Sequence, residues 1–144
     1  MTVPALGVPS HVGMVVEDLA LAKDQFGAAL GVEWDHYDHI AMTWYRGGQA
    51  IDTVMSVAYS KAGSPNIELI QEHSGGLLRI PAGNHIGFFA DDIPDTQKML
   101  EAQGMTVMCE LLHGNITLVS YMHNPHGLLV EISRPDTREI LGGS

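Results

Sequence analysis

The sequence of 144 residues predicts an α+β fold in which two βαβββ modules form a single domain. The first observation is an internal repeat, because HVGMVVEDL, which begins at His11, resembles HIGFFADDI, which begins at His85. The second is that the far ends of the two halves match, since NIELIQ carries Glu68 where LVEISR carries Glu131. Two copies are too few for a solenoid, so we expect paired modules within one domain.

Each module is expected to begin with a buried strand that leads into a helix. Residues 11–16 and 85–90 are rich in Val, Ile and Phe and are followed by acidic residues, which suit the positive end of a helix dipole. Between residues 19 and 30 the apolar side chains recur at helical spacing, and Gly31 is placed to end that helix. A second helix is expected at about 94–103, with Pro in its first turn and Gly after its end.

Three strands are expected after each helix. In the first half they lie near residues 44–45, 51–59 and 67–70, and in the second half near 106–111, 116–122 and 128–132. The stretch EHSGGLLRIPAGN, which contains three glycines and lacks periodicity, indicates a connection between the modules. We therefore expect the modules to span about residues 8–72 and about 83–134.

The charge balance excludes two classes of partner. Seven Lys and Arg against seventeen Asp and Glu give a formal net charge of −10, so a nucleic acid backbone or an anionic membrane would be repelled. No apolar run reaches membrane-spanning length, and the opening residues lack the features of a signal peptide. Cys109 is the only cysteine, which excludes an internal disulfide and suits a reducing compartment. We therefore expect a cytoplasmic protein that binds a small molecule.

Each opening strand places a His and a Gly on one face. Because side chains alternate across a strand, His11 and Gly13 point to the same side, as do His85 and Gly87. The glycines leave open space beside the imidazoles. A single strand His is more often an ordinary core or surface residue than a metal ligand, but these two occupy matching positions in the repeat.

Each closing strand carries one carboxylate in an otherwise apolar run. Glu68 and Glu131 both lie between two aliphatic residues, and a buried carboxylate needs a partner. Two neutral imidazoles and two carboxylates are a suitable ligand set for a divalent transition metal such as Zn, Ni, Co, Mn or Fe. We therefore predict one such metal site, formed by His11, Glu68, His85 and Glu131.

The other six histidines have no counterpart in the opposite module, and solvated loops are the expected place for them. Three of them, together with one tyrosine, lie in segments that flank the proposed ligand strands. These candidates for the wall of a substrate pocket are Tyr121, His73, His113 and His123.

At these residues the sequence resembles the vicinal oxygen chelate superfamily, which includes glyoxalase I, methylmalonyl-CoA epimerase, extradiol dioxygenases, fosfomycin-resistance enzymes and bleomycin-resistance proteins. The resemblance covers nearly the whole chain and rests on HVG, IELI, HIG and LLVEIS. The segment YMHNPHGLLVEI also resembles the superfamily's signature, although Asn124 replaces the usual Asp before Pro125. The resemblance implies paired βαβββ modules whose sheets curl around a metal. The ligands that it implies are His11, Glu68, His85 and Glu131.

Glu68 decides which branch the ligand set resembles. A ligand set with a fourth donor resembles that of the glyoxalase I and epimerase branches, whereas the dioxygenase and fosfomycin branches use two His and one Glu. The resemblance therefore implies an isomerase or lyase, in which a substrate with two adjacent oxygens chelates the metal as a proton leaves carbon. Glu131 and Glu68 are the expected catalytic base and acid, in either order.

Two alternatives remain open. An extradiol-type dioxygenase would hold Fe(II) with the two repeat histidines and Glu131, and would use Tyr121 with His73 or His113 as acid and base. A non-enzymatic protein similar to the bleomycin-resistance branch would bind a ligand in the same cleft. Such a protein would not need four converging metal donors.

Substrate and assembly are less constrained by the sequence. Only seven Lys and Arg, with Arg134 and Arg138 among them, could meet the charges of glutathione or coenzyme A, which argues against both substrates. Eight Met and two Trp could line an adaptable apolar pocket, so we expect a hydrophobic keto, hydroxy or acyl substrate. A homodimer is expected because strand edges and apolar helix faces need covering, with the site within one chain or shared between two.

Overall fold

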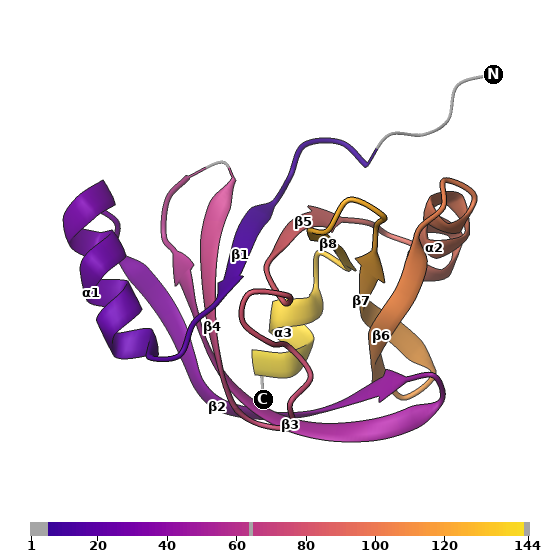
Figure 1. Cartoon of the computed structure of the whole chain (residues 1–144), viewed down its shortest axis with the longest axis horizontal. Helices are drawn as coiled ribbons and strands as arrows, with labels where there is room; N and C mark the ends of the chain where they lie inside the picture. Colours follow the sequence, from indigo (N-terminus) through magenta and orange to yellow (C-terminus); the bar gives the residue numbers. More distant parts are fainter. Residues whose placement is uncertain (1–5, 64, 143–144) are drawn as a thin grey trace.

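The computed structural model describes residues 6–63 and 65–142, and each half of this part of the chain contributes four strands to one closed barrel (Figure 1). The elements of the first half are β1 (His11–Val15), α1 (Leu19–Leu30), β2 (Trp34–Arg46), β3 (Gln49–Ser60) and β4 (Asn66–Ser74). Those of the second half are β5 (His85–Phe89), α2 (Ile93–Glu101), β6 (Thr106–His113), β7 (Ile116–His123), β8 (Leu129–Ser133) and α3 (Thr137–Gly142). The predicted α+β fold with two βαβββ units is confirmed.

Acidic caps begin the two longer helices, as the sequence indicated. The side chain of Asp18 accepts a hydrogen bond from the Leu21 amide at 3.0 Å, and that of Asp92 accepts one from the Asp95 amide at 3.0 Å. Gly31 ends α1 in the left-handed conformation with a φ of 67°, which glycine adopts without steric cost. Both predicted helices are confirmed, and α2 ends slightly earlier than predicted.

Strand pairing places the opening and closing strands of the two modules side by side. β1 pairs in parallel with β4 and antiparallel with β5, and β5 pairs in parallel with β8. Across the β1–β5 ladder, His11 lies opposite Gly87 and Gly13 lies opposite His85. The outer ladders place the two glutamates of the repeat level with the same two glycines. This register brings both ends of the repeat to one zone of the barrel wall.

β2 is much longer than the strand predicted near residues 44–45. It forms an antiparallel hairpin with β3 along nearly its whole length, and pairing of Trp44 with Leu111 joins it to β6 and closes the barrel. A bulge between Tyr37 and Ile40, where His39 has a φ of 51°, interrupts the hairpin. The polar run WDHYDHIA lacks a sustained alternation of apolar and polar residues, so its pairing with β3 was not visible in the sequence.

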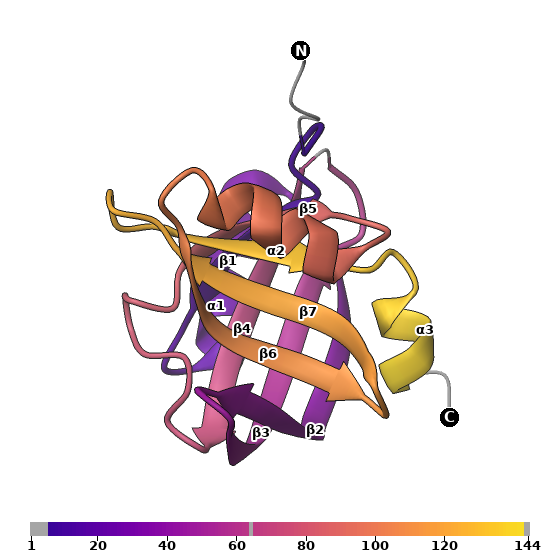
Figure 2. The ribbon, with the colours of Figure 1, turned by 90° about the vertical axis from the view of Figure 1, so that its right-hand side faces the viewer.

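The two longer helices cover the outside of the barrel. α1 lies against β3 and β4, and α2 lies against β7 and β8 (Figure 2). The buried residues at the interface of α1 with β3 and β4 are Leu19, Ala22, Ala58 and Leu69. The buried residues at the interface of α2 with β7 and β8 are Ile93, Leu100, Met122 and Ile132. A third apolar cluster, which includes Trp44, Met55 and Leu111, lies inside the barrel and borders a cavity.

α3 follows the last strand and was not expected from the sequence. The Arg134 amide donates to the Leu118 carbonyl at 2.9 Å, and the Thr137 hydroxyl donates to the Arg134 carbonyl at 2.7 Å, so both fix the start of this helix. Ile140 and Leu141 pack against the inner apolar cluster. Figure 1 shows α3 between the two halves of the barrel. Within the described residues, no helix has the length and apolar character needed to cross a membrane.

Candidate metal centre and cavity

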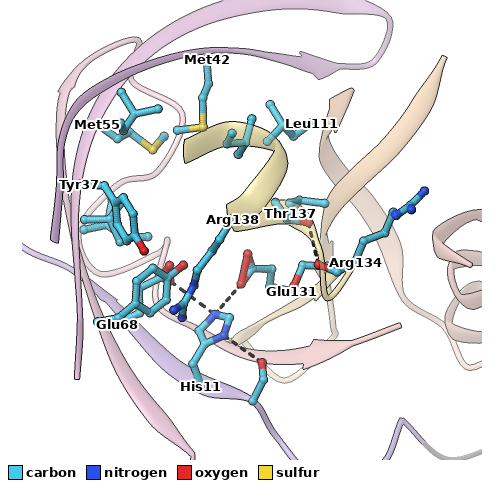
Figure 3. A pocket seen from close by; sticks show the side chains of 18 of the residues that line it. His11, Tyr37, Met42, Met55, Glu68, Leu111, Glu131, Arg134, Thr137 and Arg138 are labelled. Atoms are coloured by element: carbon cyan, nitrogen blue, oxygen red, sulfur yellow. Dashed lines mark hydrogen bonds and ion pairs between the residues drawn. The ribbon is translucent and has the colours of Figure 1, made fainter. Parts of the chain in front are cut away.

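The predicted quartet lies in the barrel wall, with one residue on each of four adjacent strands. His11 on β1, Glu68 on β4, His85 on β5 and Glu131 on β8 are buried, with exposed fractions of 5%, 3%, 0% and 6%. One ligand atom from each residue lies within 4.8 Å of the others. A single chain therefore brings all four together, and Figure 3 shows His11, Glu68 and Glu131 converging from different strands.

The closest contacts in the quartet join the two modules. His11 Nε2 lies 2.5 Å from Glu131 Oε1, and His85 Nε2 lies 2.8 Å from Glu68 Oε1. The two Nε2 atoms are 3.2 Å apart. Each histidine thus pairs most closely with the glutamate of the opposite module.

The two glycines of the repeat make room for these imidazoles. A Cβ atom on Gly13 would overlap the imidazole of His85, and one on Gly87 would overlap that of His11. The open space that the sequence predicts beside the imidazoles is present, and the register shows that each glycine makes room for the histidine of the opposite module. No larger residue fits at either position without moving a proposed metal ligand.

Hydrogen bonds on the far side of each ring direct Nε2 into the site. The Nδ1–H group of His85 donates to the Gly83 carbonyl at 2.9 Å. With Nε2 as the free ligand atom, the Nδ1–H group of His11 donates to Ser10 Oγ at 3.0 Å. Such outer partners fix the tautomer and orientation of metal-binding histidines.

The charges of the quartet shift one another's protonation. Burial would lower the pKa of His11, but Glu131 and Glu68 raise it from 6.5 to about 9. Burial would also lower the pKa of His85, which a hydrogen bond to Glu68 and the charges of both glutamates raise. For Glu68, burial would raise the pKa, but His11 and His85 lower it from 4.5 to about 2. Without a metal, His11 is therefore protonated and Glu68 ionised at neutral pH.

The donor set fits a divalent transition metal. Glu131 Oε1 is buried and accepts no hydrogen bond of ordinary geometry within the described residues, although His11 Nε2 is 2.5 Å away. A tetrahedral ion with bonds of about 2.0–2.2 Å separates its donor atoms by roughly 3.3–3.6 Å. The His11–Glu68 and His85–Glu131 separations of 3.4 and 3.5 Å match this spacing, whereas the separations of 2.5, 2.8 and 3.2 Å would widen around an ion. The cluster could therefore hold one such ion.

A cavity of about 320 Å³ opens beside the quartet, and Glu68 and Glu131 form part of its wall. Such a volume suits a small ligand, because ligand pockets range over roughly 300–1,000 Å³. The rest of the wall is mainly apolar and comes from β2, β3, β4, β6, β7 and α3. Its apolar residues include Ile40, Met42, Trp44, Met55, Val57, Ile70, Leu111, Val119 and Leu141.

Two tyrosines in this wall lie close to the quartet. Tyr59 is 6.1 Å from His11 and Tyr121 is 5.0 Å from His85, measured between ring centroids. Burial, reinforced by the charges of the two glutamates, raises the pKa of both phenols well above 10. Both tyrosines therefore face the cavity as neutral hydrogen-bonding groups.

Two arginines border the cavity where α3 begins. Arg134 forms a two-pronged ion pair with Asp136, at 3.0 and 2.9 Å. Arg138 instead extends its guanidinium over the Tyr59 ring, with Cζ 3.5 Å from the ring centroid. The sequence showed both arginines only as scattered cations, because a helix of six residues is too short to give a periodic signal.

Of the residues predicted for the pocket wall, the structure places Tyr121 there and three histidines elsewhere. His73, His113 and His123 are exposed and are not among the described residues that line this cavity. His73 lies on the opposite face of β4 from Glu68 and stacks on His39, with ring centroids 4.3 Å apart. The other two lie at the last positions of β6 and β7. Nearness in sequence to a ligand strand did not determine which way these side chains point.

One protein-family model matches the chain. The model, described as the Glyoxalase/Bleomycin resistance protein/Dioxygenase superfamily, matches residues 10–116, which is more than half of the chain. This range includes three residues of the quartet, and the structure adds Glu131 from beyond it. No curated protein matches the sequence.

Several solved structures share the fold. A hypothetical protein from Bacillus halodurans has a TM-score of 0.58 at 16% identity, with 88% of this chain and 92% of that chain covered. Methylmalonyl-CoA epimerase from Mycobacterium tuberculosis has a TM-score of 0.54 at 18% identity, with coverages of 94% and 93%. The Streptomyces coelicolor epimerase, in complex with 2-nitronate-propionyl-CoA, has a TM-score of 0.50 at 19% identity, with coverages of 90% and 98%. At such identities the similarity shows the fold alone.

Proposed function

Because the chain belongs to the Glyoxalase/Bleomycin resistance protein/Dioxygenase superfamily, we propose that it is a divalent-metal-dependent enzyme of the glyoxalase or epimerase type. Its reaction is a proton-transfer isomerisation or lyase reaction on a small chelating keto, hydroxy or acyl substrate. The observation that carries this proposal is the buried quartet, in which Glu68 adds a fourth donor to the two histidines and Glu131. The fold shared with methylmalonyl-CoA epimerases supports it as well.

The quartet is the proposed metal site. When bound there, a divalent ion such as Zn, Ni, Co, Mn or Fe supplies Lewis-acid stabilisation of negative charge on the substrate oxygens. Ser10 and the Gly83 carbonyl hold the imidazoles in the ligating orientation. The apolar cavity wall limits the access of water to the reacting carbon.

Glu131 and Glu68 are the proposed catalytic base and acid, in either order. Both carboxylates border the cavity, so each is placed to take a proton from a substrate carbon or return one. A hydrogen bond between Glu68 and Tyr59 contributes to the lowered pKa of this carboxyl group. Glu131 Oε1 lies 2.5 Å from His11 Nε2 and accepts no hydrogen bond from a tyrosine within the described chain.

Proton exchange tests the proposed reaction. Metal-loaded protein is incubated in heavy water with a panel of apolar keto, hydroxy and acyl compounds, and proton NMR follows the hydrogens beside the chelating oxygens. We expect deuterium to enter at that carbon without oxygen consumption. Glu68→Gln and Glu131→Gln should each slow the exchange, whereas Glu110→Gln, a change on β6 outside the cavity wall, should not.

The alternative reactions give different results. Catechol-dependent oxygen uptake without proton exchange would support the extradiol dioxygenase, for which Tyr121 in the cavity wall is the favourable observation. Ligand binding that does not change when a chelator removes all metal would instead support a non-enzymatic binding protein.

A further inference from the structure

We propose that Arg138 binds an anionic oxygen of the substrate, and that the substrate is a small carboxylate with an apolar tail. This inference rests on the proposed function, since it assigns a substrate class to the same cavity. Arg138 lies on α3, and Figure 3 shows its side chain reaching from this helix towards His11 and Glu68. Its guanidinium thus lies beside the quartet, in the wall of the cavity.

Arg138 has no anionic partner within the described chain. None of the described carboxylates lies within 4.0 Å of its guanidinium, and the guanidinium instead stacks on Tyr59. Arg134, which borders the same cavity, is neutralised by its two-pronged pair with Asp136. Arg138 therefore offers a planar pair of donors that matches the geometry of a carboxylate.

The charges around the cavity leave room for one anion. Two carboxylates and one divalent cation sum to zero when the two histidines are neutral ligands. Arg134 and Asp136 also cancel. Arg138, which is exposed, then adds one positive charge at the edge of this mainly apolar wall. A singly charged anion completes the balance.

The shape of the cavity defines the remainder of the ligand. Met42, Met55 and Leu111 lie on the far side of the cavity from His11 (Figure 3). A carboxylate held by Arg138 would therefore direct an apolar tail onto these side chains. The volume of about 320 Å³ limits this tail to a short chain or a small ring.

A pair of probes of similar size tests the inference by binding rather than by activity. Hexanoate and hexanamide, which differ in charge but share a tail, are titrated by calorimetry into zinc-loaded wild type and Arg138→Gln. We expect wild type to prefer hexanoate by roughly 10- to 100-fold, as for other charge-assisted hydrogen bonds, and Arg138→Gln to lose most of that preference. Affinity for hexanamide should change little.

Three controls separate Arg138 from other causes. Arg79→Gln removes the same charge from an exposed loop outside this cavity and should keep the preference. Arg138→Lys keeps the charge but not the planar donor pair, so its preference should lie between those of wild type and Arg138→Gln. Zinc content and circular dichroism are measured for every variant, and Arg138→Lys decides the question if Arg138→Gln does not fold.

Two outcomes would overturn the proposal. A preference for hexanoate that survives in Arg138→Gln would assign carboxylate binding to the metal, and equal binding of both probes by wild type would remove the carboxylate from the substrate class. Failure of the proposed reaction is seen separately, because the proton-exchange assay does not use these probes. If the protein proves to bind no metal, the same titrations still compare wild type with Arg138→Gln.

Discussion

Two glycines, which have no side chain to offer a metal, make room for the histidines of the quartet. Gly13 leaves space for His85, and Gly87 leaves space for His11, each across the β1–β5 ladder. The absence of a side chain is therefore as important at these two positions as the imidazole is at the other two. Both glycines have extended backbones, so the requirement is for space rather than for unusual dihedral angles.

We predict that Gly87→Ala weakens metal binding. The new Cβ would displace the imidazole of His11, and a shifted ligand should reduce the affinity at least roughly tenfold, as do changes to the outer partners of metal ligands. The matched control is Gly27→Ala in α1, where a Cβ meets only ordinary contacts and alanine favours the helix. Competition with a metal-binding dye measures both affinities. Equal affinities in the two variants would contradict the steric role of Gly87.

Metal binding should weaken in acid. Because the pKa of His11 is raised to about 9 in the metal-free site, a metal must displace a proton at any lower pH. We expect the affinity to rise with pH up to about 9, with proton release that fades above this value. Calorimetry in two buffers of different ionisation enthalpy counts the protons. Affinity that does not change between about pH 6 and about pH 9 would be incompatible with this site.

The same pKa shifts set the stability of the metal-free protein. The raised pKa of His11 stabilises the fold fully below pH 6.5, and this stabilisation is lost as pH rises through about 9. The lowered pKa of Glu68 stabilises the fold above pH 4.5, and this stabilisation is lost as pH falls towards about 2. The quartet therefore contributes most between about pH 4.5 and 6.5. Urea unfolding in chelator should show a loss of stability towards pH 9 that is absent from the His11→Ala, His85→Ala variant.

Among single residues, the sequence predicted those that the repeat marks twice. His11, His85 and the two glutamates occupy matching positions, and the barrel brings them together. Arg138 has no counterpart in the other module and lies on a helix of only six residues, so no pattern distinguished it from other surface cations. Contacts across the barrel depend on register, which a single sequence does not show.

Helices and short buried strands carried the strongest signals in the sequence. α1 and α2 have acidic caps and apolar residues at helical spacing, and both lie where predicted. β2 and α3 lacked such signals, because β2 alternates poorly and is stabilised by pairing with β3, while α3 is stabilised by contacts with β7 and the inner cluster. Tertiary pairing rather than local preference determines these two elements.

The cap of α2 gives a test at the level of the helix. Asp92 accepts a hydrogen bond from the Asp95 amide, so Asp92→Ala should lower the free energy of unfolding by about 1 kcal/mol. Asp91→Ala removes the same charge one residue earlier and should have a smaller effect. Urea denaturation of both variants measures the difference. Equal losses would show that charge near the helix, and not the cap, stabilises α2.

For the molecule as a whole, the closed barrel removes one of the two reasons to expect a homodimer. Its described strands have neighbours on both sides, so strand edges no longer favour a partner. The predicted homodimer then rests on apolar helix faces alone, where Leu21 and Leu30 of α1 are 53% and 54% exposed. Light scattering that shows a dimer at micromolar concentration would agree with this expectation, and a monomer mass would refute it.

A mixing experiment separates the two possible origins of the site. One chain brings all four ligands together, so His11→Ala and His85→Ala proteins should not recover metal binding after subunit exchange. Recovery would mean that ligands are shared between two chains. Mass spectrometry of isotope-labelled subunits serves as the control that exchange has taken place.

Metal content tests the quartet itself. Elemental analysis of protein purified without chelator should find close to one transition metal per chain, because two imidazoles and two buried carboxylates converge on one point. The His11→Ala, His85→Ala variant should contain almost none, whereas His36→Ala, which changes an exposed histidine on β2, should match wild type. Equal metal content in wild type and the double variant would contradict the proposed metal centre.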